Sequence, residues 1–262
     1  MTTVEVLGCN ATAPGRTGAA SSYLVRDEAT AVLVDAGPGS LLSFARTHDL
    51  SELSGIVVTH LHADHSLDLM AWAYRWTFPD VLPRIPLYVP AEEMGRLERF
   101  DELFGIPTLP TMVSPIRSAF DVRGLELDSR TPVGIGSWTI TPHRALHSVP
   151  SAALRFAGAD GVVCFSSDTG PCRGVIDAAT GADVFVCEST VLAADDDVIH
   201  GHGHLTPELA AGIASEAGAR HLVLTHFARP EEAQEMGRIA SRHFDGPVTV
   251  AREGATVSVD AR

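Results

Sequence analysis

Four side chains that can bind a metal ion fall within six residues of this sequence: His60, His62, Asp64 and His65. They directly follow the β-branched run 56–58, which predicts a short strand buried on both faces. Imidazole nitrogens and carboxylate oxygens are the donors that suit Zn²⁺ and its first-row neighbours. Crowding four such groups at a strand end brings no structural benefit without a cation. The pattern HxHxDH therefore predicts a metal-binding loop rather than a solvated, histidine-rich one.

Three apolar runs in the second half of the chain also end in polar side chains. VVCFSSDTG leads into Asp168, DVFVCEST into Glu188 and HLVLTHF into His226. The carboxyl ends of the strands in α/β sheets meet at one edge, where such folds place their sites. A further strand, predicted at 137–141, is followed by PHRALHSVPS, which offers His143 and His147 as candidates for another ligand. We expect these groups to converge on the metal-binding loop.

A candidate proton donor precedes a well-marked helix. Thr206 is a good N-cap, a proline occupies the first helical position, and Gly218 ends the helix. His204 lies directly before this helix and so has a fixed position, which favours a catalytic role. His200 and His202, spaced by glycines, belong either to a flexible loop or to an adventitious metal site.

The remaining elements position these groups. Short strands are predicted at 4–7, 22–26, 31–35, 247–251 and 256–259, and helices from Pro38, over 91–104 and over 230–243. Loop 8–18 has no phosphate-binding signature and is expected near the mouth of the site. Asp35, at a strand end, either solvates its turn or orients a metal-bound histidine. The proline-rich segment 107–117 is interpreted as a lid or connecting loop.

Aromatic residues gather at 72–78, directly after the metal-binding loop. Core packing or a dimer face is the favoured explanation. The alternative is that Trp72, Trp76 and Phe78 line an apolar substrate pocket.

Length and composition are those of a soluble globular protein with one domain, 1–262. The chain has 45% apolar and 20% charged residues and shows no linker or second core. Its net charge of −14 argues against general nucleic-acid binding. The four cysteines form no CxxC pair and are expected to be reduced, with Cys164 and Cys187 buried. No stretch has the length or character of a signal peptide or membrane span, so we expect a cytoplasmic protein.

These motifs resemble those of the metallo-β-lactamase-fold hydrolases over nearly the whole chain. The residues that carry the resemblance are THLHADH, His147, SSDTG and LTHF. CEST, with Glu188, and HLT, with His204, are similar to the HEAT and HST motifs of the RNase Z-like branch. The resemblance implies an α/β (α+β) fold, a four-layer αβ/βα sandwich, and a homodimer.

The resemblance also implies two divalent metal ions. His60, His62 and His147 would hold one ion, with His143 the rival to His147. Asp64, His65 and His226 would hold the second, and Asp168 would bridge the two. Zn²⁺ is expected, and Mn²⁺ or Fe²⁺ also suits these donors.

Two departures from the RNase Z pattern bear on the substrate. Only 20 residues separate His147 from Asp168, enough for one strand pair and too few for the basic arm that binds tRNA. Cys187 stands where the HEAT motif begins with histidine. The chain is thus similar to small armless members, some of which cleave cyclic nucleotides.

The function predicted is a dinuclear metal phosphodiesterase acting on a small phosphodiester such as a cyclic nucleotide. A metal-bridging hydroxide attacks the phosphorus, Asp64 holds or accepts its proton, and His204, oriented by Glu188, protonates the leaving group. Hydrolysis of a thioester or lactone is the alternative, and tRNA 3′ processing is less favoured. A di-iron redox protein with a flavin partner would place glutamate at His62. A catalytically inactive metal-binding module would not need the complete set of ligands together with Glu188 and His204.

Overall fold

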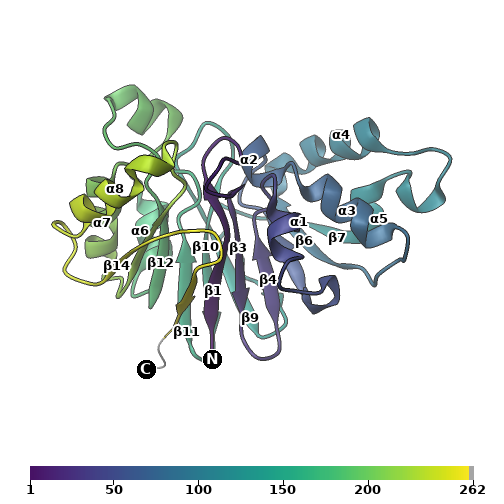
Figure 1. Ribbon diagram of the computed structural model, residues 1–262, viewed down its shortest axis with the longest axis horizontal. Helices are drawn as coiled ribbons and strands as arrows, with labels where there is room; N and C mark the ends of the chain where they lie inside the picture. The colour runs from purple at the N-terminus through teal and green to yellow at the C-terminus, as the bar shows by residue number, and fades with distance from the viewer. Residues whose placement is uncertain (260–262) are drawn as a thin grey trace.

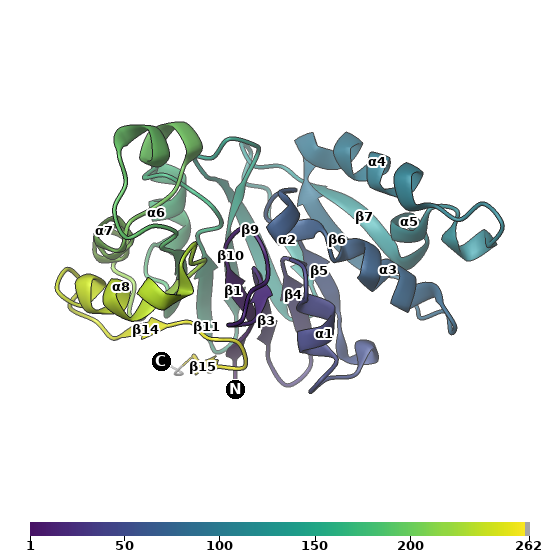
Figure 2. The same cartoon turned by 45° about the horizontal axis from the view of Figure 1, so that its top comes forward.

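Two β-sheets pack face to face between two outer layers of helices (Figure 1). This computed structural model describes residues 1–259, so residues 260–262 of the predicted domain lie outside the described residues. Figure 2 shows the helices α1 to α5 on one side of the sheets and α6 to α8 on the other. The predicted four-layer αβ/βα sandwich is confirmed.

The first sheet has the strand order β15-β1-β3-β4-β5-β6-β7, with β2 beside β1. Its strands are β1 (Thr3–Asn10), β2 (Ala19–Ala20), β3 (Ser22–Arg26), β4 (Ala31–Val34), β5 (Gly55–Val57), β6 (Ile85–Pro90), β7 (Phe120–Leu125) and β15 (Thr256–Ser258). Strands β4 to β7 are parallel to one another. Their connections carry α1 (Ser40–Phe44), η1 (Leu50–Glu52), α2 (Ala63–Ser66), α3 (Leu69–Thr77), η2 (Ala91–Glu93), α4 (Met94–Phe104), η3 (Pro110–Met112) and α5 (Pro115–Ala119).

The second sheet has the order β14-β13-β12-β11-β10-β9-β8 and is parallel from β11 to β14. Its strands are β8 (Val133–Ile135), β9 (Trp138–Arg144), β10 (Ala152–Gly158), β11 (Gly161–Phe165), β12 (Val184–Glu188), β13 (Leu222–Thr225) and β14 (Val248–Val250). Its connections carry α6 (Arg173–Ala179), the π-helical turn η4 (Asp197–His202), α7 (Pro207–Ala217), η5 (Pro230–Glu232) and α8 (Ala233–Ala240). The parallel arrangement brings the carboxyl ends of β11, β12 and β13 to one edge, as the sequence predicts.

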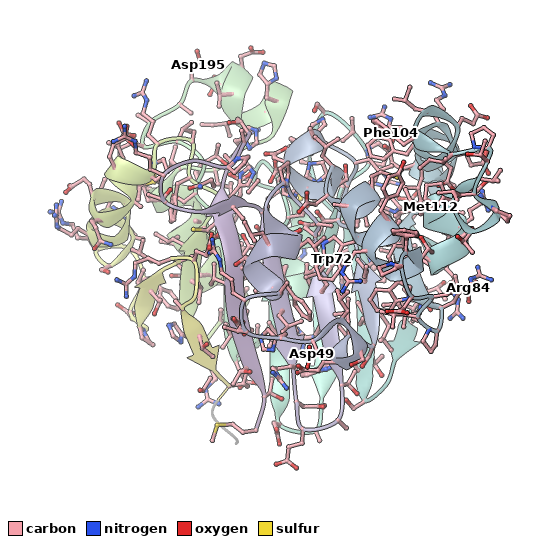
Figure 3. All side chains as sticks on the ribbon, turned by 45° about the vertical axis from the view of Figure 1, so that its right-hand side comes forward. Asp49, Trp72, Arg84, Phe104, Met112 and Asp195 are labelled. Atoms are coloured by element: carbon pink, nitrogen blue, oxygen red, sulfur yellow. The ribbon has the colours of Figure 1, made fainter. Side chains whose placement is uncertain are left out.

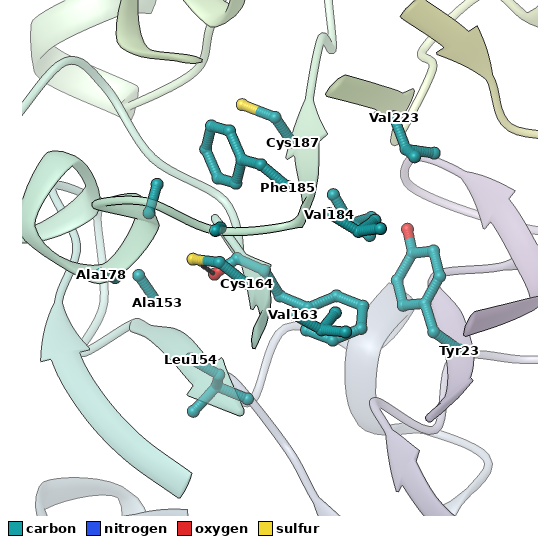
Figure 4. Packing of buried hydrophobic residues seen from close by; sticks show 14 of the residues in the cluster. Tyr23, Ala153, Leu154, Val163, Cys164, Ala178, Val184, Phe185, Cys187 and Val223 are labelled. Atoms are coloured by element: carbon teal, nitrogen blue, oxygen red, sulfur yellow. Dashed lines mark hydrogen bonds between the residues drawn. The ribbon is translucent and has the colours of Figure 1, made fainter. Parts of the chain in front are cut away.

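Side-chain alternation along the central strands fills two layers of core at once. In β3, Tyr23 and Val25 belong to the cluster between the sheets, whereas Leu24 belongs to the cluster beneath the helices of the first sheet. Figure 4 shows Tyr23 of the first sheet lying beside Val184 and Val223 of the second. Such two-sided burial explains why these strands are continuous apolar runs in the sequence.

The aromatic cluster after the metal-binding loop belongs to the core. Trp72 and Trp76 are 0% and 2% exposed on α3, and their indole N–H groups donate to Ser40 Oγ and Pro83 O. Phe78 is 57% exposed at the end of α3. Figure 3 shows Trp72 within the helical layer of the first sheet, away from Asp195, which precedes η4. The alternative of an apolar substrate pocket lined by Trp72, Trp76 and Phe78 is therefore wrong.

The proline-rich segment 107–117 is more regular than predicted and is no lid. It contains η3 and the start of α5, and Ile116 is fully buried in the core that α3 shares. Asp101 of α4 accepts hydrogen bonds from the backbone N–H groups of Ile116 (2.7 Å) and Arg117 (3.2 Å), which caps α5. This long-range cap has no local signature in the sequence.

Strand β9 continues three residues beyond its predicted end, because β10 pairs with it as far as Arg144. His143 is consequently a strand residue and is 6% exposed. The charges that act on it come from Arg130, Asp177 and Arg155, which belong to or contact the region of α6. Strand pairing thus separates His143 from the edge at which the other candidates meet.

The helix before β13 has the predicted boundaries. Thr206 Oγ1 accepts from the backbone N–H of Leu209, and Gly218 adopts the left-handed conformation at the carboxyl end of α7. The predicted helix 230–243 is shorter, consisting of η5 and α8. Among residues 1–259, no helix combines the length and hydropathy needed to cross a bilayer.

Candidate metal centre

The loop after β5 presents its side chains because Asp35 holds the backbone that follows the strand. Asp35 Oδ1 accepts from the backbone N–H of Thr59 (2.7 Å), and Oδ2 accepts from the Thr59 hydroxyl (3.0 Å) and from His65 Nδ1 (2.7 Å). His62 then stands at the N-cap of α2, a helix whose single turn carries Asp64 and His65. Asp35 therefore orients a candidate ligand, which is one of the two roles that the sequence left open.

The structure brings all seven predicted ligands into two adjacent groups of donor atoms. Within each group the atoms lie within 4.8 Å of one another. The first group is His60, His62, His147 and Asp168; the second is Asp64, His65 and His226. The two oxygens of Asp168 face different groups: Oδ1 lies 3.2 Å from His65 Nε2, whereas Oδ2 lies 3.8 Å from the Nε2 atoms of His60 and His147.

Hydrogen bonds on the outer side of the first group determine which ring nitrogen carries the proton. The Thr59 hydroxyl donates to Asp35, so its oxygen accepts from His60 Nδ1 at 3.1 Å. His147 Nδ1 donates to the carbonyl of Gly203 at 3.1 Å. The network therefore assigns unprotonated Nε2 atoms to both neutral rings.

The inner nitrogens of this group repel one another unless a cation lies between them. His60 Nε2 and His147 Nε2 lie 3.2 and 3.1 Å from His62 Nδ1, and one proton on His62 would serve only one of these neighbours. Burial lowers the pKa of all three histidines, which keeps the rings neutral, the form that binds metal. Four ligands about 2.0–2.1 Å from a tetrahedral Zn²⁺ are separated by about 3.3 Å. The residues fit a divalent metal ion.

The second group is built to hold positive charge. Burial would lower the pKa of His65, but Asp168 and Asp35 outweigh it and raise that pKa well above its usual value. Burial would raise the pKa of Asp64, but the hydrogen bond from His226 and the nearby imidazoles lower it. His65 Nε2 lies 3.1 Å from His226 Nε2, and His226 Nε2 lies 3.3 Å from Asp64 Oδ2. A proton and a metal ion compete for this position.

Glu188 is the centre of the network that holds His204. It is 1% exposed; Oε1 accepts from the backbone N–H of Thr169 (2.8 Å), and Oε2 accepts from Leu205 N–H (3.0 Å) and the Thr190 hydroxyl. His204 Nδ1 lies 3.1 Å from Glu188 Oε1. Burial opposes protonation of His204, but Glu188 outweighs it and raises the pKa to about 9. His204 is consequently a protonated imidazole at neutral pH.

A cavity of about 370 Å³ opens over both groups. His204 and His202 border it on one side, and Ala11 and Thr12 of loop 8–18 border it on another, which is the mouth position expected for that loop. Its other lining residues are His62, Ala63, Asp64, His147, Ser148, Asp168, Thr190 and His226. Among residues 1–259, neither arginine nor a large apolar side chain lines it, and the sequence contains no lysine.

Three other histidines that the sequence analysis considered do not join the donor groups. His143 lies in β9, and its Nδ1 has no hydrogen-bond partner among residues 1–259. His200 is exposed on η4. His202 borders the cavity but is 64% exposed, with its ring 3.5 Å from Asp197.

Sequence reasoning missed the residues that hold the ligands through hydroxyl or backbone groups. Thr59 and Thr190 accept from histidines of the two donor groups, and Gly203 offers its carbonyl to His147. A Cβ at Gly203 would lie 2.0 Å from the carbonyl oxygen of Leu146, so only glycine fits. Thr59 adjoins a ligand in the sequence, which is a usable signal, whereas nothing local identifies the other two.

A family model described as a beta-lactamase superfamily domain matches residues 30–227, which include every candidate ligand. The chain belongs to the β-lactamase superfamily. Members of this superfamily with the metallo-β-lactamase fold are generally hydrolases, and the protein is a hydrolase of that fold.

Superfamily members similar to this chain include curated bacterial proteins and a solved structure. An uncharacterised Mycobacterium leprae protein is 33% identical over 264 residues, covering 98% of this chain and 89% of its own. A Streptomyces coelicolor protein named ribonuclease Z is 30% identical over 298 residues, covering 98% and 97%. The metallo-beta-lactamase fold protein YhfI of Bacillus subtilis superposes with a TM-score of 0.85 at 23% identity, covering 98% and 100%. The predicted RNase Z-like resemblance is confirmed.

Proposed function

We propose that this superfamily member is a dinuclear metal-dependent phosphodiesterase that hydrolyses small phosphodiesters such as cyclic nucleotides. The observation that carries the proposal is the His204–Glu188 pair at the edge of the cavity, beside both donor groups. Cleavage of an alkyl phosphodiester releases an alkoxide, which is a poor leaving group until it is protonated. An imidazolium held by a buried carboxylate supplies that proton.

His60, His62 and His147 would hold one metal ion, Asp64, His65 and His226 the other, and Asp168 both. Zn²⁺ suits these donors, and so do Mn²⁺ and Fe²⁺. Once bound, two such cations lower the pKa of a shared water and polarise a phosphoryl oxygen.

Asp64 is arranged to accept a proton from the attacking water. Its Oδ2 is occupied by the backbone N–H of Thr12 (2.7 Å) and faces His226 Nε2. No donor among residues 1–259 contacts its Oδ1, and the residue borders the cavity. His204 is a proton donor, so Asp64 would act as the base and His204 as the acid.

The cavity supports a small substrate over tRNA. Its volume of about 370 Å³ suits a mononucleotide-sized ligand, and among residues 1–259 no arginine lines it to follow a nucleic-acid backbone. Only the β10–β11 hairpin occupies the chain between His147 and Asp168. The acidic chain, with a net charge of −14, would repel a polyanion. The name ribonuclease Z of the Streptomyces relative does not by itself assign tRNA processing to this chain.

Thioester or lactone hydrolysis is the competing outcome. In the described part of the chain, residues 1–259, alanines are the only apolar side chains that line the cavity, because Trp72 and Trp76 are in the core. A thioester releases a thiolate, which leaves without a proton donor, so thioester hydrolysis gives no reason for the His204–Glu188 pair. A lactone releases an alkoxide, and the argument against it is the small apolar lining alone.

A substrate panel on protein loaded with Zn²⁺, Mn²⁺ or Fe²⁺ tests the proposal. It comprises bis(p-nitrophenyl) phosphate, 3′,5′-cyclic AMP, an acyl-CoA, a lactone and a precursor tRNA. We expect turnover of the first two, measured as released nitrophenolate and as 5′- or 3′-nucleotide. Turnover confined to the acyl compounds, or to tRNA, would refute the proposal.

We also propose a homodimer located in the cytoplasm. Leu42, Phe78 and Val81 are 63%, 57% and 63% exposed near a groove between α1 and the end of α3, which favours burial against a second copy. All four cysteines are free, and three are buried, which favours a reducing compartment. Light scattering during gel filtration tests the dimer; a monomer at micromolar concentration contradicts it.

A further inference from the structure

Backbone strain in this protein is concentrated at the metal centre. Within residues 1–259, five residues other than glycine have φ between +52° and +65°. Four of them adjoin the centre, namely Thr12, Asp35, Ser167 and His226, and the fifth is Arg130. Asp35 and His226 have identified tasks there, since one orients His65 and the other is a candidate ligand. Strain at a functional site persists where the strained residue is needed.

The Ser167 hydroxyl lies 2.8 Å from Ser151 Oγ and 3.4 Å from His60 Nδ1, so its side chain also has a task at the centre. Of these four residues, Thr12 is the one whose side chain has no such task. Threonine is β-branched, and its side chain clashes with the backbone in the left-handed region more than those of Asp, Asn or His. At φ +65° it is the only β-branched member of the set in residues 1–259. Glycine would adopt this conformation freely.

The backbone of Thr12 has a structural task that does not require threonine. Its N–H donates to Asp64 Oδ2 at 2.7 Å. Ala11 is held in place by a hydrogen bond from its N–H to the carbonyl of Phe227 (3.1 Å), and Asn10 bridges to the same segment. Glycine at position 12 would donate the same N–H to Asp64 without strain. The backbone role therefore does not account for a β-branched side chain at this position.

The hydroxyl of Thr12 is available to a ligand. Thr12 is exposed and borders the cavity that His204 and the two donor groups share. Its Oγ1 has no hydrogen-bond partner among residues 1–259, in contrast to Thr17 of the same loop, whose hydroxyl donates to Asn10 Oδ1 at 2.8 Å. Among residues 1–259 no arginine lines the cavity, and the sequence has no lysine, so an anionic oxygen there depends on imidazoles such as His204 and on hydroxyl groups such as that of Thr12.

We propose that Thr12 is a substrate-binding residue whose hydroxyl donates a hydrogen bond to a non-bridging phosphoryl oxygen. This inference rests on the proposed phosphodiesterase function. The backbone N–H of Thr12 fixes Asp64 while its hydroxyl holds the phosphoryl group, so one residue sets the distance between proton acceptor and substrate. The bond favours phosphoryl over acyl substrates, because a phosphodiester has a charged oxygen to accept it and a thioester does not.

The test compares Thr12→Val, which keeps the shape and N–H but removes the hydroxyl, with Thr12→Ser, which keeps both groups. Inorganic phosphate and acetate are titrated calorimetrically into the metal-loaded proteins. We expect Thr12→Val to weaken phosphate binding about tenfold and Thr12→Ser to remain within about threefold of the natural protein. Acetate affinity should change less than phosphate affinity in Thr12→Val. Equal phosphate affinities of the Val and Ser variants would overturn the inference.

A third variant separates strain from binding. Thr12→Gly should raise the Tm of the metal-free protein by about 2 °C, because the left-handed backbone is relieved, yet weaken phosphate binding as Thr12→Val does. A Tm that falls would show that the side chain stabilises the loop, and would overturn the strain argument. If the natural protein hydrolyses no phosphodiester, the proposed function fails, and the phosphate titration still decides the role of Thr12.

Discussion

Replacing Asp35 with asparagine should selectively weaken metal binding at the second donor group. The carboxylate faces donors on both sides: His65 Nδ1 at 2.7 Å and the N–H and hydroxyl of Thr59 at 2.7 and 3.0 Å. An asparagine oxygen satisfies only one side, and its NH₂ then opposes a donor on the other. If the NH₂ faces His65, the imidazole proton moves to Nε2 and blocks the nitrogen that would bind metal.

The expected losses of metal affinity and of folding stability follow from the donors that face position 35. Losing the orienting partner of a ligating histidine weakens metal binding about 10- to 100-fold, or about 1.4–2.7 kcal/mol. Position 35 is only 2% exposed, so a donor left there without an acceptor costs about 1–3 kcal/mol of folding stability. Each lost kcal/mol should lower the Tm by about 2–4 °C in a chain of this size.

Chelator competition followed by elemental analysis measures both sites of the Asp35→Asn variant. We expect the group containing His60 to keep its affinity and the group containing His65 to bind metal about 10- to 100-fold more weakly. Asp101→Asn is the matched control, since Asp101 is buried, accepts two backbone N–H groups and lies on α4. It should lower the Tm without changing metal binding. Two unchanged metal affinities in Asp35→Asn would refute the assigned role of the carboxylate.

Three further changes test other parts of the site and fold. His204→Ala should keep both metals but lose about 10²- to 10⁴-fold in rate with an alkyl leaving group and much less with nitrophenolate. His200→Ala, on the same loop, is the control. Equal rate losses with both leaving groups would show that His204 is not the general acid. Gly203→Ala should weaken metal binding at the group containing His147, because the new Cβ displaces the carbonyl that orients this ring; an unchanged metal content after dialysis against a chelator would contradict this. Burial lowers the pKa of His143 to about 4, so the folded protein binds fewer protons than the unfolded chain between pH 6.5 and 4. Its free energy of unfolding should therefore decrease as the pH falls from 6.5 to 4. His143→Leu should flatten this loss by about 1–2 kcal/mol in urea unfolding of the metal-free protein at pH 7.5 and 5, and parallel pH profiles would show that another group is responsible.

The metal centre could be anticipated from the sequence because its donors follow local rules. HxHxDH places four of the seven candidate ligands on one strand-end loop, so their proximity is a property of a short segment. Asp168, Glu188 and His226 each follow an apolar run, and parallel strands bring such positions to one sheet edge. Long-range convergence was therefore predictable here without knowledge of side-chain contacts.

Strand pairing decided what local pattern left open. His143 and His147 are equivalent as isolated residues, but the register of β9 with β10 keeps His143 in the sheet and releases His147 beyond it. Trp72 and Trp76 follow the metal-binding loop directly, yet α3 turns them into the core beneath the first sheet. Proximity in sequence is a poor guide to proximity in a cavity when a helix intervenes.

The sequence by itself determined the donor types, their segments, the helix that holds His204 and the layered α/β architecture, because each depends on spacing within a short stretch of chain. Only the tertiary structure decided the supports of those donors: Asp35 behind His65, the Gly203 carbonyl behind His147 and the strained Thr12 beside Asp64. These contacts join residues 30 to 56 positions apart. They depend on how two sheets pack, which no local pattern encodes.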